Sequence, residues 1–205
     1  MPEPATRPRT FGVLVFDGAE ELDFVGPWEV ITASAMLQKE QGDPVDQALL
    51  IAESDQPVRC NKGMRVLPDA TTAAHADIDV LLVPGGNGTR REATNPDLLS
   101  WIADVGATAE WVTSVCTGSL LLVASGIAKD RSVATHWGFE DTLAARGDCT
   151  VIRDQRWVRD GNIVSSQGVS AGIDMALWLL GELYGPDHAR ATQRYIQYDP
   201  APPYA

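Results

Sequence analysis

The stretch WVTSVCTGSLLLVASG, residues 111–126, decides the fold of this chain. Its first five residues are mostly β-branched or aromatic and predict a buried strand. The residues from Thr117 to about Ser125 predict a helix, and Gly126 ends it. Cys116 lies at the joint between strand and helix. A strand that turns directly into a helix is typical of a sheet covered by helices, and it places the thiol at the turn.

The segments around this stretch repeat the alternation of strand and helix. Strands are predicted for residues 11–16, 47–52, 79–86 (DVLLVPGG, ending in a Gly-Gly turn) and 132–135, edge strands or a hairpin within 55–70, and a hairpin around Asp160-Gly161 within 156–166. Helices are predicted for residues 22–37, 95–105, 117–125, 138–147, 170–184 (capped by Ser170) and 186–195. The expected fold is therefore α/β, a flavodoxin-like three-layer sandwich with a mainly parallel central sheet and the cysteine on a strand-to-helix turn.

Composition narrows the classes of function. The 205 residues carry a net charge of −12, which argues against a non-specific nucleic-acid binder. No apolar run reaches the length of a membrane span, and the polar, Pro-rich residues 1–10 predict a disordered lead-in to one domain over residues 11–205. Three widely spaced cysteines and three histidines predict neither disulfides nor a metal site. We expect a cytoplasmic protein.

The position of Cys116 has two readings. In an α/β fold the turn after a strand faces the ligand cleft, and the N–H groups of the next helix favour an anion. A thiol there would ionise more easily and act as a nucleophile, with the Thr117 hydroxyl beside it. The alternative is a buried, unreactive cysteine, which is the interpretation we give to Cys60 and Cys149.

A nucleophile also needs a proton partner and donors for developing negative charge. Gly85 and Gly86 end a predicted central strand, so their N–H groups are candidates for an oxyanion site. The candidate proton partners are His136 and the acidic cluster after the first strand, which contains Asp17, Glu20, Glu21 and Asp23. The residue types alone do not choose among them.

Several segments together resemble one known family. They are FDGAEELDFVGPWEV, LLVPGG, VTSVCTGSLLLVASG, ATHWGFED, DGNIVSSQGVSAGID and YDPAPPY, spread in order from Phe11 to Tyr204. This combination resembles the ThiJ/PfpI superfamily of glutamine-amidotransferase-like domains, and within it the isonitrile hydratase (isocyanide hydratase) branch.

The resemblance implies roles for individual residues. Cys116 would be the nucleophile, Asp23 the proton-donating carboxylate, and Thr117 the residue whose hydroxyl and amide adjoin the thiolate. His136 matches the superfamily histidine near the cysteine. The implied reaction adds water to an isonitrile through a cysteine thioimidate, which gives an N-substituted formamide without a metal or cofactor. The implied partners are a small-molecule substrate and a second copy of the chain, with Trp28, Trp178 and Tyr184 as exposed interface candidates; no DNA-binding region is expected.

One segment departs from the family pattern. Relatives carry a Gly-rich run before AGID, whereas this chain has Ser165-Ser166-Gln167-Gly168. Gln167 and Gly168 are therefore expected at the substrate pocket, and the Gln167 side chain either narrows it or points to solvent. Two other functions stay open: a glyoxalase, deglycase or amide hydrolase on the same scaffold, and a thiol-based redox or ligand sensor without turnover.

Overall fold

A computed structural model describes residues 7–201 of the chain. Residues 1–6, most of the predicted lead-in, and residues 202–205, in the final YDPAPPY segment, lie outside the described residues. The predicted boundary between the lead-in and the domain, after residue 10, lies beyond the first ordered contacts of the chain. Strand β1 begins at Thr10, whose N–H donates to Asp79 Oδ2 at 2.8 Å, and the Arg9 guanidinium pairs with Glu110 at 2.8 Å. These contacts fix the backbone before the first apolar residue.

A central sheet of seven strands organises the molecule. In spatial order the strands are β10 (Trp157–Asp160), β11 (Ile163–Ser166), β7 (Trp111–Val115), β6 (Val80–Val83), β1 (Thr10–Leu14), β2 (Gln47–Ala52) and β5 (Ala70–Thr71). Every pairing is parallel except that between β10 and β11, which is the predicted hairpin. Outside this sheet, β3 (Val58–Arg59) pairs with β4 (Arg65–Val66), and β8 (Ser132–Val133) with β9 (Thr150–Val151).

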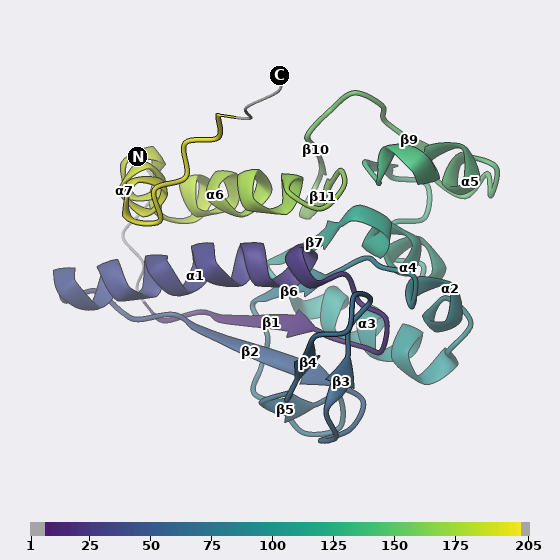
Figure 1. The fold of residues 1–205 in the computed structure, drawn as a ribbon, viewed down its shortest axis with the longest axis horizontal. Coiled ribbons are helices and arrows are strands. Elements are labelled where there is room, and N and C mark those ends of the chain that lie inside the picture. The colour runs from purple at the N-terminus through teal and green to yellow at the C-terminus, as the bar shows by residue number, and fades with distance from the viewer. Residues whose placement is uncertain (1–6, 202–205) are drawn as a thin grey trace.

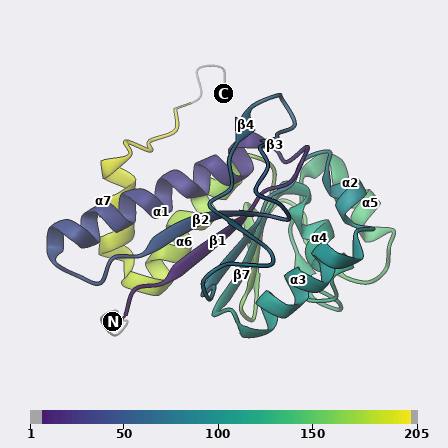
Figure 2. The ribbon, with the colours of Figure 1, turned by 90° about the horizontal axis from the view of Figure 1, so that it is seen from below.

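Helices cover both faces of the sheet. They are α1 (Glu21–Gln41), α2 (Thr89–Glu92), α3 (Pro96–Thr108), α4 (Ser119–Ala124), α5 (Glu140–Ala144), α6 (Ala171–Tyr184) and α7 (Pro186–Tyr195). Helices α1, α6 and α7 pack together over one face, and α3 and α4 lie over the other (Figures 1 and 2). The prediction of a three-layer α/β sandwich with a mainly parallel sheet is confirmed. No helix within residues 7–201 combines the length and apolarity needed to cross a bilayer.

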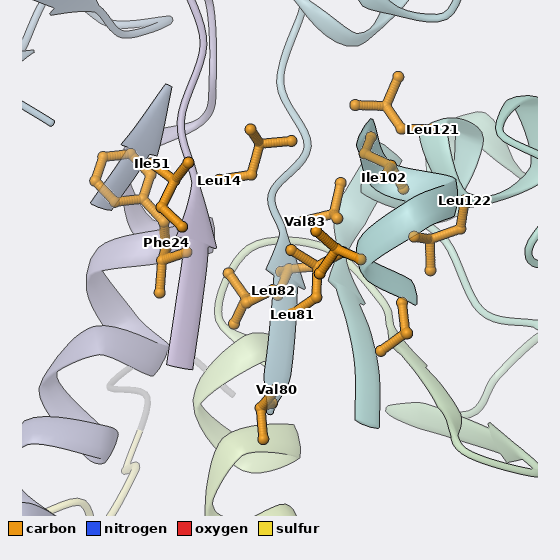
Figure 3. Packing of buried hydrophobic residues seen from close by; sticks show 14 of the residues in the cluster. Leu14, Phe24, Ile51, Val80, Leu81, Leu82, Val83, Ile102, Leu121 and Leu122 are labelled. Carbon is orange, nitrogen blue, oxygen red and sulfur yellow. The ribbon is translucent and has the colours of Figure 1, made fainter. Parts of the chain in front are cut away.

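The main core forms on both faces of β6, whose four residues are all buried. Val80 and Leu82 face the side of α1 and α6, while Leu81 and Val83 face the helices on the other side (Figure 3). Ile102, Leu121 and Leu122 from α3 and α4 complete that second layer of packing. A continuous apolar run is what a strand buried on both faces requires.

Topology brings three loops to one edge of the sheet. Strand β1 lies between β2 and β6, so the order of the strands reverses beside β1. Ligands of open parallel sheets bind where the order reverses, beyond the carboxyl ends of the strands. The segments that follow β1, β6 and β7 carry Asp23, Gly85 and Cys116 to this place.

Several local predictions differ from the structure. The helix after Cys116 begins at Ser119, not Thr117, because residues Cys116–Gly118 form a 3-10 turn. Strand β8 pairs with β9, so the predicted strand at 132–135 does not extend the central sheet. Ser170 occupies the N-cap position of α6 but its side chain makes no capping hydrogen bond.

The prediction that three aromatic residues are exposed at an interface is wrong about their exposure. Trp28, Trp178 and Tyr184 are only partly exposed and pack against the core. Trp178 also makes an edge contact with Trp111, with 5.9 Å between the ring centroids. They bury apolar surface within the chain, where helix and sheet meet.

Candidate active site

Cys116 sits on a strained turn. Its φ of 57° lies in the left-handed region, which costs a non-glycine residue free energy unless surrounding contacts hold it. Those contacts are present: the Cys116 N–H donates to Gln167 O at 3.2 Å, and its carbonyl accepts from Ser119 Oγ at 3.2 Å and Thr135 Oγ1 at 3.0 Å. The turn therefore holds the side chain above the ends of β6 and β7, with 6% of the residue exposed.

The prediction of an acidified thiol is wrong for the resting structure. The N–H groups of Thr117 and Val169 and the Thr117 hydroxyl do lower the pKa of Cys116. Burial and the charge of Asp23 act in the opposite direction and are stronger, so the pKa rises to about 12. Helix α4 begins three residues after Cys116 and is short, so its dipole lowers the pKa of the thiol only weakly. A thiolate must therefore form by proton transfer inside the site.

Asp23 is placed to make that transfer. It lies in the first turn of α1 and is completely buried. Its Oδ2 accepts the Gly85 N–H at 2.9 Å, while Oδ1 has no hydrogen-bond partner meeting ordinary geometry among the described residues. Burial raises the pKa of Asp23 to about 7, against lowering by the Gly85 bond and by contact with the Cys116 thiol. The carboxyl group thus exchanges its proton near neutral pH.

Asp23 and Cys116 are best treated as one titrating pair. Between pH values of about 7 and about 12 the pair holds one proton. That proton resides either on sulfur, beside a carboxylate, or on Asp23, beside a thiolate. The second arrangement is the one that nucleophilic attack needs, and the N–H groups of Thr117 and Val169 stabilise its sulfur anion.

Gly85 and Gly86 are close to the cysteine but do not supply the predicted oxyanion donors. The Gly85 N–H is taken by Asp23 and the Gly86 N–H by Thr117 Oγ1 at 3.0 Å. A Cβ on Gly85 would lie 2.5 Å from Thr117 N and 2.8 Å from Asp23 Oδ2. The absence of a side chain at Gly85 therefore lets Asp23 and Thr117 approach each other.

Thr117 and Val169 provide the donors at the sulfur. Thr117 Oγ1 is buried and accepts the Gly86 N–H at 3.0 Å, which fixes the side chain with its hydroxyl proton available to the sulfur. Val169 has a φ of 53°, so its N–H is turned by an unusual backbone conformation. Val169 was not predicted from the sequence, because nothing in an aliphatic side chain signals the use of its backbone N–H.

His136 lines the cavity but makes no hydrogen bond to Cys116 in the described chain. Its Nδ1 accepts the Gly138 N–H at 3.1 Å, so the proton of the neutral ring is on Nε2. A ring in this form donates and does not act as a base through Nε2. Gly168 packs on the ring: a Cβ there would lie 2.3 Å from His136 Cδ2.

The Gln167 side chain neither narrows the pocket nor extends freely into solvent. Its Nε2 donates to Glu140 Oε1 at 3.3 Å, away from the residues that line the cavity. The backbone of Gln167 matters more, since its carbonyl holds the Cys116 N–H. The departure from the family pattern therefore leaves the cavity open.

A cavity of about 340 Å³ opens above the sulfur. It is lined by Glu20, Asn61, Lys62, Gly86, Asn87, Arg90, Cys116, Thr117, His136 and Val169. Of the acidic cluster after the first strand, Glu20 lines this cavity and Asp23 lies behind the sulfur. The other two acids lie elsewhere: Asp17 accepts the backbone N–H of Arg59, and Glu21 accepts that of Lys62, in the neighbouring hairpin. Lys62, Asn61 and Arg90 were missed, because no local motif distinguishes them from surface polar residues.

The other two cysteines do not line the cavity above Cys116, and Cys149 is half-buried rather than buried as predicted. Cys60 is buried, and burial with the nearby charge of Glu21 raises its pKa to about 11. Burial also raises the pKa of Cys149. All three thiols are free. Within residues 7–201, no three His, Cys, Asp or Glu side chains gather closely enough to hold a metal ion.

The buried carboxyl group makes stability depend on pH. Folding raises the pKa of Asp23 to about 7, so the folded state holds the Asp23 proton more tightly than the unfolded chain does. The resulting contribution to the free energy of unfolding is fully present below the pKa of Asp23 in the unfolded chain, and it is lost as pH rises through 7. Asp23→Asn, which keeps an acceptor for Gly85, is therefore expected to be more stable than the wild type at pH 8 by about 2–4 kcal/mol.

Urea unfolding at pH 5 and pH 8 measures this effect. The gap between Asp23→Asn and the wild type is expected to narrow at pH 5, where the native carboxyl group is neutral. Asp97→Asn, at an exposed carboxylate in α3, controls for the simple loss of a negative charge. If Asp23→Asn is no more stable than the wild type at pH 8, folding does not raise the pKa of Asp23.

Comparisons with known proteins show the family of the chain. A model of the DJ-1/PfpI family matches residues 10–182. The chain is 37% identical over 193 residues to an isonitrile hydratase of Pseudomonas putida, covering 94% of this chain and 80% of that protein. It is 30% identical over 181 residues to the Parkinson disease protein 7 homolog of Danio rerio, covering 86% and 90%. The crystal structure of a ThiJ/PfpI family protein from Pseudomonas syringae matches with a TM-score of 0.87 at 32% identity, covering 100% and 84%. The resemblance seen in the sequence is confirmed, and the chain belongs to the DJ-1/PfpI family.

Proposed function

We propose that this protein adds water to an isonitrile, R–N≡C, and releases an N-substituted formamide. One observation carries the proposal: a fully buried carboxyl group with a pKa of about 7 lies against the thiol of Cys116 and keeps one oxygen free of other partners. The similarity to an isonitrile hydratase supports the same chemistry. An isonitrile needs both a nucleophile and a proton at its terminal carbon, and this pair supplies both.

The first step uses the single proton of the pair. With that proton on Asp23, the Cys116 thiolate attacks the terminal carbon while Asp23 protonates the same carbon. The C–S and C–H bonds form, the electron pair moves to nitrogen, and the product is the thioimidate R–N=CH–S–Cys116. Asp23 is left as a carboxylate. The N–H groups of Thr117 and Val169 hold the sulfur anion before attack.

The second step reverses the role of Asp23. The carboxylate takes a proton from water as the oxygen adds to the thioimidate carbon, and passes it to the imine nitrogen. As the tetrahedral adduct collapses, Asp23 takes the proton of the adduct hydroxyl, the C–S bond breaks, and R–NH–CHO is released. The thiolate and the neutral carboxyl group return, and the sum is one isonitrile plus one water.

This cycle predicts the dependence of rate on pH. The reactive state holds one proton, so kcat/KM is expected to rise about tenfold per pH unit below 7 and to level off between about pH 8 and pH 9. The sign follows from the loss of the second proton from the pair. Initial rates across pH 5 to 9 measure it, and a rate that falls over that range would mean that the doubly protonated pair is the reactive state.

The proposal is tested with p-nitrophenyl isonitrile, with the formamide detected by mass. Methylglyoxal is assayed beside it, because a glyoxalase or deglycase would consume that compound. Formamide with no loss of methylglyoxal is the expected result. Consumption of methylglyoxal alone would favour the other enzymes of the family. Oxidation of Cys116 by peroxide without turnover of either compound would favour a thiol sensor.

We also propose a homodimer in a reducing, cytoplasmic compartment. The free state of all three cysteines fits such a compartment. Four exposed apolar residues support an interface: Leu22, Val25, Met64 and Leu67, which lie on the start of α1 and at the adjoining hairpin. Burial of apolar area is the usual stabilisation of a permanent dimer.

A further inference from the structure

We infer that the isonitrile this site takes carries a carboxylate close to its nitrogen, and that Arg90 selects it. The inference rests on the proposed function and names the substrate class: short isocyano carboxylates, which hydration converts into N-formyl amino acids.

Most side chains that line the cavity above Cys116 are polar. Of the residues lining the cavity, only Val169 carries an aliphatic side chain. Asn61, Asn87, Lys62 and Glu20 line it with amides and charges. A purely apolar substituent would remove water from these groups without replacing its hydrogen bonds, which costs free energy. The cavity therefore favours a substituent with polar or charged atoms.

The charges on one wall are already paired. Lys62 Nζ forms an ion pair with the buried carboxylate of Glu20, whose other oxygen accepts Asn61 Nδ2 at 2.8 Å. Asn87 Nδ2 in turn donates to Asn61 Oδ1 at 2.9 Å. This wall is satisfied internally, and it offers no excess charge to a ligand.

Arg90 is different. Within residues 7–201 its guanidinium contacts only uncharged groups: NH1 donates to Gly86 O at 3.0 Å, Thr89 Oγ1 at 3.1 Å and Thr117 Oγ1 at 3.3 Å. Its Cζ lies 4.5 Å from the centre of the Phe139 ring. One nitrogen and one face are thus held, while NH2 and Nε make no hydrogen bond to the described chain. A held guanidinium with free donors is suited to a carboxylate, and little side-chain entropy remains to be lost.

Arg90 lies close to the reacting sulfur. Thr117 Oγ1 contacts Arg90 NH1 and also hydrogen-bonds the Cys116 sulfur. The charge of Arg90 therefore lies one side chain away from the reacting atom. The shortest substrate of this class carries its carboxylate one carbon from the isonitrile nitrogen, and its reaction balances as CN–CH2–COO⁻ plus water to OHC–NH–CH2–COO⁻.

The experiment compares isocyanoacetate with its methyl ester, which keeps the isonitrile and removes the charge. Formamide formation is followed for wild type, Arg90→Gln and Arg91→Gln. The wild type is expected to prefer the acid by at least about tenfold in kcat/KM, and Arg90→Gln to bring the ratio near one. Arg91→Gln is the matched control, because Arg91 is paired with Glu92 and does not line this cavity. A wild-type ratio at or below one, or an unchanged ratio in Arg90→Gln, would overturn the role of Arg90.

Failure of the proposed reaction is recognised separately. If neither compound is consumed, calorimetric titration with N-formylglycine and its methyl ester replaces the assay. Binding of the acid that is at least about tenfold tighter than that of the ester, and that is lost in Arg90→Gln alone, would keep the anion site and reject the reaction. Equal binding of both compounds, or binding unaffected by Arg90→Gln, would reject the anion site as well.

Discussion

Cys116→Ser is expected to lower kcat/KM toward p-nitrophenyl isonitrile by at least about a thousandfold. The hydroxyl of serine is far less acidic than a thiol, so its proton does not pass to Asp23, whose pKa is about 7, and the nucleophilic anion does not form. The change replaces one atom in a cavity wall. The loss should therefore appear in kcat, with the thermal midpoint of unfolding nearly unchanged.

Cys149→Ser is the control for this variant. Cys149 is a half-buried free thiol on the loop before β9, outside the residues that line the cavity. We expect wild-type turnover from it. A Cys116→Ser protein that is folded and still forms the formamide at more than about a tenth of the wild-type rate would exclude Cys116 as the nucleophile.

Asp23→Asn is expected to lower kcat by at least about a hundredfold. The amide preserves the shape and an acceptor for the Gly85 N–H, but it can neither give a proton to the isonitrile carbon nor take one from water. The same change stabilises the fold at pH 8, so the loss of activity and the gain of stability separate catalysis from folding. The rise of rate through pH 7 should also disappear.

Asp23→Glu gives the matched comparison. It restores a carboxyl group but adds a methylene in a space where Asp23 is completely buried and Gly85 is in contact. We expect activity between that of Asp23→Asn and the wild type, together with lower stability. If Asp23→Asn keeps wild-type kcat and an unchanged pH profile, another group supplies the proton.

Much of the fold followed from the sequence because local patterns and topology agree here. Buried runs such as 79–86 and the Asp160-Gly161 turn have few alternative structures. The start of α4 was displaced by the left-handed backbone of Cys116, which no residue-type preference signals. The short strand β8 was assigned no partner by its own sequence, since its pairing with β9 depends on a contact formed across α5.

The site was predictable to a different extent. The strand-to-helix turn indicated Cys116, but only the family resemblance selected Asp23 over His136 and the other acids. The raised pKa of the thiol was not predictable, because it is a balance between N–H donors and burial beside a carboxylate. The Gly85 N–H donates to Asp23 and the Gly86 N–H to Thr117, and each partner lies more than thirty residues away in the sequence. Long-range contacts of this kind also bring Lys62 and Arg90 to the cavity.

The central claim is that Cys116 bonds to the isonitrile carbon with a proton governed by Asp23. Intact-protein mass after rapid acid quench of the wild type with p-nitrophenyl isonitrile tests it most directly, because the thioimidate must wait for the water step. The predicted result is a protein heavier by one whole isonitrile molecule, with the added mass on the peptide that contains Cys116, and no adduct in Cys116→Ser or in Asp23→Asn, which lacks the proton donor of the first step. Formamide release by the wild type with no adduct on Cys116 at any quench time would contradict covalent catalysis.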